Sequence, residues 1–110
     1  IINSNGDADE DAWGKRVSWV DFNGPVEGEI MGVAMLNHPD SFRYPTPWHV
    51  RTYGLFTANP FALEKVAGEK DSGDVDLAKD QSITLRHRII FHEGDEKTAK
   101  IAEAWQVYAQ

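Results

Sequence analysis

Residues 16–37 read R-V-S-W-V-D-F-N-G-P-V-E-G-E-I-M-G-V-A-M-L-N. β-Branched and aromatic side chains dominate residues 16–22, and Asn23-Gly24-Pro25 is typical of a turn. Residues 29–37 are apolar at both odd and even positions, which indicates a strand that is covered on both faces. We therefore predict a β-hairpin connected through residues 24–28, with its second strand at the centre of a sheet.

The segment 37–61 holds four of the five prolines, so regular helix is disfavoured through most of it. Within it, residues 48–53 predict a short strand. The alternation of that strand assigns its side chains to two faces: Trp48, Val50 and Thr52 on one, His49, Arg51 and Tyr53 on the other. We expect the first face to meet a core, and the second, which is cationic and hydrogen-bonding, to meet solvent or a ligand.

Residues 82–92 give the clearest strand pattern in the chain. Ile83, Leu85, Ile89 and Phe91 share one face with His87, which favours a core position for that histidine. Gly94 breaks the pattern, and Asp95 is well placed to cap a helix that runs to the C-terminus. These elements predict a mainly β protein, an antiparallel β-sandwich portion with a C-terminal α-helix. We expect residues 1–12 to be an acidic loop or terminus.

Composition narrows the functional classes. The chain has 110 residues, a formal net charge of −7 and no cysteine. An acidic domain repels the phosphate backbone, so nucleic acid is a poor partner, and disulfides and thiolate chemistry are excluded within this chain. The longest apolar run, residues 30–36, is far shorter than the roughly 20 residues of a membrane helix, so we expect no membrane span. The absence of cysteine fits both oxidising and reducing compartments and leaves the localisation open.

Four or five strands with one helix leave sheet edges that invite further pairing. We therefore expect the chain to associate with the remainder of a larger parent chain or with another copy of itself.

Candidate site residues concentrate in the segment 37–61, together with six of the twelve aromatic residues. His49 is the predicted acid or base because imidazole titrates near neutral pH, and Arg51 beside it offers forked donors to a substrate oxygen or carboxylate. These two are the predicted catalytic residues. The predicted substrate-binding residues are His38, Arg43, Tyr53 and Asn59. Loop-stabilising hydrogen bonds from the histidines and internal salt bridges from the arginines are the alternative interpretation.

The chain also resembles a known family. The resemblance rests on W-V-D-F-N-G-P at 19–25, G-V-A-M-L-N-H-P at 32–39, P-T-P-W-H-V-R-T-Y-G-L-F-T-A-N-P-F at 45–61 and R-I-I-F-H-E-G-D at 88–95. These motifs are similar to those of the bacterial PmoA-like family, uncharacterised soluble proteins with the inherited label methane oxygenase. Members are longer, so the resemblance implies that this chain is a C-terminal portion, with residues 13–110 as the C-terminal part of a β-sandwich domain. It also implies a β-sandwich of the galactose-mutarotase-like kind and an association with bacterial carbohydrate use.

Three functional hypotheses follow from these residues and from the resemblance. The first is a carbohydrate-active or carbohydrate-binding β-sandwich, because aromatic rings beside Arg, His and Asn suit the apolar faces and hydroxyls of a sugar or another small polar ligand. The second is a metal-dependent oxygenase with copper or iron held by His38 and His49. The third is a non-catalytic structural or assembly module. The sequence names no cofactor and leaves open whether the protein is an enzyme.

Overall fold

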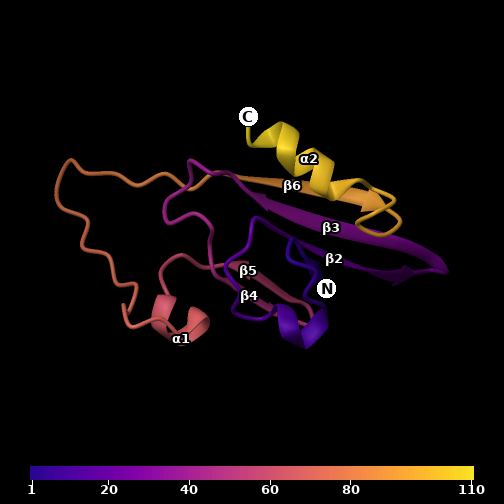
Figure 1. Ribbon diagram of the computed structural model, residues 1–110, viewed down its shortest axis with the longest axis horizontal. Coiled ribbons are helices and arrows are strands. Elements are labelled where there is room, and N and C mark those ends of the chain that lie inside the picture. The colour runs from indigo at the N-terminus through magenta and orange to yellow at the C-terminus, as the bar shows by residue number, and fades with distance from the viewer.

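The computed structural model describes residues 1–110 as two antiparallel sheets and three short helical elements (Figure 1). The larger sheet has the order β1-β2-β3-β6 and the smaller pairs β4 with β5. The strands are β1 (Ile2–Asn3), β2 (Trp19–Val26), β3 (Glu29–Asn37), β4 (Trp48–Arg51), β5 (Leu55–Ala58) and β6 (His87–Glu93). The helices are the 3-10 helix η1 (Asp9–Ala12), α1 (Leu63–Ala67) and α2 (Ile101–Tyr108). The predicted class, mainly β and antiparallel with a C-terminal helix, is confirmed.

Strands β2 and β3 form the predicted hairpin, and β3 lies between β2 and β6, which confirms it as a central strand. The predicted connection was too long. Pairing continues through Pro25, opposite Ile30, and the turn itself is Glu27-Gly28. Both turn residues have positive φ, 52° and 85°, as a two-residue hairpin turn with the right-handed twist of a sheet requires. Pro25 is tolerated because β1 pairs only with Val20 and Asp21, which leaves this part of β2 at the sheet edge.

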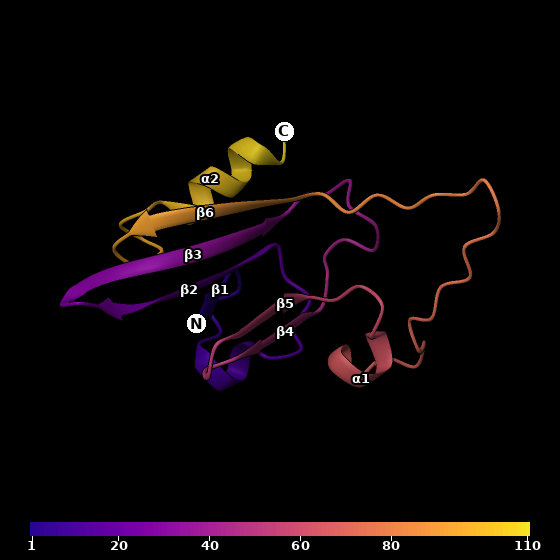
Figure 2. The same cartoon turned by 180° about the vertical axis from the view of Figure 1, so that it is seen from behind.

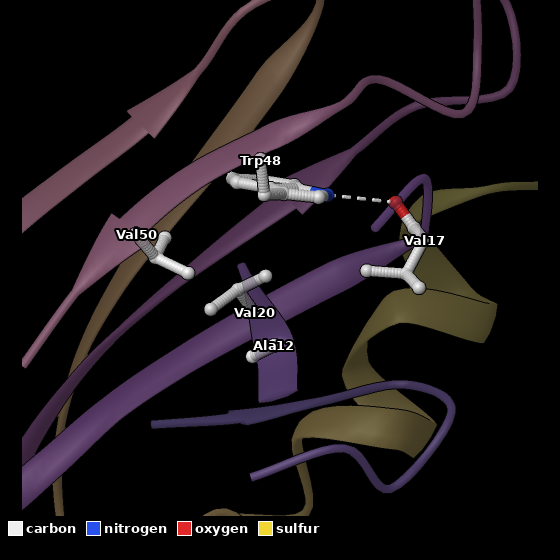
Figure 3. Close-up of a cluster of buried hydrophobic side chains, with 5 residues drawn as sticks. All are labelled: Ala12, Val17, Val20, Trp48 and Val50. Atoms are coloured by element: carbon white, nitrogen blue, oxygen red, sulfur yellow. Dashed lines mark hydrogen bonds between the residues drawn. The ribbon is translucent and has the colours of Figure 1, made fainter. Parts of the chain in front are cut away.

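The larger sheet is the middle of three layers. The β4–β5 hairpin packs on one face at one end, and α2 lies over the other face (Figures 1 and 2). The core between the two sheets consists of Ala12, Val17, Val20, Trp48 and Val50 (Figure 3). The indole of Trp48 is fully buried and donates to the carbonyl of Val17 at 2.9 Å, so its one polar atom is satisfied inside an apolar cluster. The apolar face predicted for Trp48 and Val50 is confirmed, although β4 ends at Arg51.

The second core lies under α2. It joins Trp19, Ala34 and Leu36 of the sheet to Ile101 of the helix. The helix begins later than predicted, because Asp95 caps a separate turn by accepting from the backbone N–H groups of Lys97 and Thr98 at 3.1 and 2.8 Å. Lys100, at φ 55°, then separates that turn from α2.

The face of β6 that was expected to meet the core is uncovered. Ile89 is 54% and Phe91 80% exposed, whereas Ile90 on the opposite face packs under α2. The hairpin β4–β5 is too short to reach this end of the sheet (Figure 2). Strand β6 also begins at His87 and not at residue 82, where the sequence predicted its start. Residues 69–86 form no helix or strand. β6 is therefore an edge strand with an exposed apolar face.

Candidate functional site

The outer face of the β4–β5 hairpin carries the predicted catalytic pair. His49 and Arg51 point away from Trp48 and Val50. Both meet the indole of Trp13: the Arg51 guanidinium carbon lies 4.5 Å from the ring centroid, and the His49 ring stands edge-on to it at 5.8 Å. Arg51 is exposed and forms no ion pair, whereas His49 is half-buried. The three side chains form one surface, here called the hairpin face.

Backbone pairing beside β4 brings Trp13 to the hairpin face. The N–H of Gly14 donates to the carbonyl of Trp48 at 2.8 Å, and the N–H of Trp48 donates to the carbonyl of Lys15 at 3.1 Å. Gly14 has φ 77°, and a side chain there would collide with the carbonyl of Val66. The sequence did not single out Trp13, because its contacts to residues 49 and 51 are distant along the chain and leave no local pattern. Its indole N–H is the one fully buried side-chain polar atom without a hydrogen-bond partner.

Tyr53 lies in the turn between β4 and β5 and is 81% exposed. Arg43, by contrast, is committed to internal contacts. Its Nη1 donates to the carbonyls of Pro60 and Gly73 at 2.8 and 2.7 Å, and its own carbonyl accepts from Arg16. Its φ of 56° is unusual for a residue with a side chain. Arg43 thus links its own loop to the segments that carry Arg16, Pro60 and Gly73.

His38 and Asn59 also make internal hydrogen bonds. His38 is 3% exposed, its Nδ1 accepts from the backbone N–H of Asp40 at 3.0 Å, and its ring meets Tyr108 edge-on at 5.0 Å. Asn59 accepts from the backbone N–H of Phe61 at 3.0 Å. The structure therefore brings His49 and Arg51 together with Trp13, and gives His38, Arg43 and Asn59 different neighbours.

A second polar cluster, not predicted from the sequence, lies on the α2 side of the sheet. Nε2 of His92 is 2.6 Å from Oδ1 of Asp21, and Nδ2 of Asn23 donates to Oδ2 of Asp21 at 2.7 Å. Asp21 is fully buried and the His92 side chain is 6% exposed. The sequence did contain a signal for this cluster, an aspartate within an apolar strand, because a buried carboxylate requires a partner.

The two strand histidines have opposite pKa shifts. Burial by itself lowers the pKa of His92, but hydrogen bonds and charge from Asp21, with the carbonyls of Glu93 and Gly94, raise it above its ordinary value overall. Burial lowers the pKa of His87. Nε2 of His87 lies 3.3 Å from Nδ2 of Asn37, whose Oδ1 accepts from Thr46. That arrangement makes His87 an acceptor and therefore neutral.

Two surface hollows lie elsewhere. The larger, about 640 Å³, follows the uncovered end of the sheet, and strand alternation places the side chains of Phe22, Met31, Val33 and Phe91 toward it. The smaller, about 550 Å³, lies between residues 2–6 and α2. None of the six predicted site residues lines either hollow.

No three His, Cys, Asp or Glu side chains are grouped in a way that could hold a metal ion. His38 and His49 in particular contact different aromatic residues, Tyr108 and Trp13. Neither α-helix has the length and apolar character needed to cross a bilayer.

Comparison with protein families places the chain in one of them. Residues 1–106 match the model of DUF6807, a family of unknown function. The chain belongs to this family. No curated protein and no solved structure matches it.

Proposed function

We propose that the protein binds carbohydrate at the hairpin face, with His49 as the acid or base of any reaction and Arg51 as the group that orients the ligand. One observation carries this proposal: Arg51 and His49 flank the ring of Trp13 at 4.5 and 5.8 Å. Sugar sites combine aromatic rings with planar polar groups, because the rings cover the apolar C–H faces of a sugar while the polar groups form hydrogen bonds with its hydroxyls.

The charge of the hairpin face favours a sugar that carries a carboxylate. Arg51 is exposed and has no carboxylate partner in a chain of net charge −7. A guanidinium matches a carboxylate with two parallel hydrogen bonds, which adds direction as well as attraction. Tyr53 in the adjoining turn would flank the same ligand. His38, Arg43 and Asn59, with their internal hydrogen bonds, would hold the loops behind it.

Calorimetric titration with neutral and uronic-acid oligosaccharides tests the proposal. We expect uronic-acid oligosaccharides to bind more tightly than neutral ones. Arg51→Ala should weaken binding by about tenfold or more, the effect of losing a charge-assisted hydrogen bond. Any turnover should be lost in His49→Gln while binding persists.

Arg88→Ala is the matched control, because the Arg88 guanidinium also lies 4.5 Å from an aromatic ring, that of Tyr108, away from the hairpin face. Glycan binding that is unchanged in Arg51→Ala, together with any turnover that is unchanged in His49→Ala, would refute the assignment.

We also infer an assembly role for β6: a further strand from a longer parent chain or a second copy would pair along its free edge and cover its exposed apolar face. Phe91 is 80% exposed beside an apolar hollow, and β6 has one free edge. Exposed edge strands with apolar side chains are sites of strand addition.

Light scattering over a concentration series tests association between copies. We expect Phe91→Asp to abolish association, whereas Val107→Asp, on an α2 residue 67% exposed, should leave it intact. A wild-type protein that stays monomeric at every concentration would contradict pairing between copies.

A further inference from the structure

The smaller hollow has the features of a second ligand site. Its volume of about 550 Å³ falls within the range of small-molecule sites, and its lining includes Asn5, Trp19, Glu96, Lys97 and Glu103. No residue of the hairpin face belongs to it.

Trp19 contributes an unused hydrogen-bond donor. The residue is 7% exposed, and its indole N–H makes no hydrogen bond within the chain. The only fully buried polar side-chain atom without a partner belongs to Trp13, so Nε1 of Trp19 keeps contact with solvent. Because an indole N–H can only donate, a ligand for this position must present an oxygen acceptor.

The charged groups of the hollow carry one excess negative charge. Glu96 and Glu103 oppose a single Lys97, and none of the three forms an ion pair. Two carboxylates left unpaired beside one hollow favour a cation, and the excess of one charge matches a monocation.

The buried cluster behind the hollow orients one of these carboxylates. Nδ2 of Asn23 approaches Oε2 of Glu96 at 3.5 Å and also donates to Asp21, which His92 holds at 2.6 Å. The amide of Asn23 thus supports the carboxylate of Glu96, whereas Glu103 projects from α2 and is exposed.

The opposite wall is also organised before any ligand binds. Asn3 is 1% exposed, and its Oδ1 accepts from the backbone N–H groups of Asn5 and Asp7, each at 3.0 Å. A wall fixed in this way loses little conformational entropy on binding.

We propose that this hollow binds a small polyhydroxylated amine, such as an amino sugar, in its ammonium form. The ammonium lies between the carboxylates of Glu96 and Glu103, and a ring or hydroxyl oxygen accepts from Nε1 of Trp19. This site does not depend on the glycan site at the hairpin face.

Isothermal titration calorimetry with D-glucosamine tests the proposal, with D-glucose and N-acetyl-D-glucosamine as uncharged matches. We expect only glucosamine to bind. The double variant Glu96→Gln/Glu103→Gln should weaken binding by at least about tenfold, because two charge-assisted hydrogen bonds are lost.

Glu29→Gln/Glu64→Gln removes the same charge from exposed positions outside the hollow and should bind as wild type does. Trp19→Phe, which keeps a ring but removes the donor, should also weaken binding, with circular dichroism to verify folding. Arg51→Ala should have no effect on glucosamine. Equal binding of glucose, full affinity in the Glu96/Glu103 double variant, or no binding at millimolar glucosamine would each overturn the proposal.

Discussion

Nε2 of His92 on β6 lies 2.6 Å from Oδ1 of Asp21 on β2, although the whole of strand β3 separates their two strands. The imidazole reaches across β3 at Gly32, its register partner. Its other nitrogen, Nδ1, faces the carbonyl of Glu93 at 3.2 Å. Since both nitrogens face oxygen acceptors, both carry protons, and the pair is an imidazolium and a carboxylate inside the sheet.

This geometry predicts that alkaline pH weakens the fold. The pKa of His92 is raised in the folded state, mainly by Asp21 acting against the effect of burial. The folded protein therefore holds a proton that the unfolded chain releases above about pH 6.5. Its contribution is complete below that pH and is lost as pH rises through the raised pKa. Urea denaturation at about pH 6 and about pH 9 measures the loss. His92→Gln should show less of it, and an equal loss in that variant would contradict the assignment.

The crossing also predicts a strict requirement for glycine at position 32. A Cβ atom there would collide with Cε1 of His92 and lie 2.6 Å from Nε2. Gly32→Ala should displace the ring from Asp21 and destabilise the protein by about 1–3 kcal/mol, the usual range for overpacking. Gly24→Ala is the control, since nothing lies within 4 Å of a Cβ atom at that position. Chemical denaturation of both variants would decide, and equal stabilities would argue against a close crossing.

His87 is predicted to act in the opposite pH range. Burial lowers the pKa of His87, so the folded state binds a proton less readily than the unfolded chain, which accepts one below about pH 6.5. Stability should therefore fall as the pH drops through that value, and His87→Gln should lose less on acidification. Denaturation between about pH 7 and about pH 5 measures the difference. A variant as acid-sensitive as the wild type would show that other groups cause the loss.

Local patterns predicted part of this fold well. The two-sided apolar run of β3 gave its central position, and the alternation in β4 separated Trp48 and Val50 from His49 and Arg51. Such patterns succeed where each side chain's environment follows from its neighbours in sequence. They failed for β6, because an apolar face shows that a residue can be buried and not that anything covers it. Ile89 and Phe91 are exposed for that reason.

The candidate site shows the same limit. Trp13 reaches His49 and Arg51 through pairing between distant segments, and His92 reaches Asp21 across another strand. Contacts of this kind depend on tertiary register, for which no spacing rule exists in a single sequence. Polarity and proline content located the segment 37–61, but could not distinguish Arg51, on the surface, from Arg43, whose guanidinium is occupied by two carbonyls.

The β2–β3 turn offers a stabilising substitution. Glu27 has φ 52°, a left-handed conformation that costs residues with ordinary side chains about 1–2 kcal/mol. Asparagine accepts this conformation more readily, and Asn-Gly is the preferred pair for two-residue hairpins with two positive φ values. Glu27→Asn should therefore raise the free energy of unfolding by about 0.5–1 kcal/mol. Glu27→Ala separates the effect of charge from that of backbone strain, because alanine removes the carboxylate but retains the strain. If alanine stabilises the protein as much as asparagine, the gain comes from removing negative charge in an acidic chain, and the strain at this turn is not what limits stability.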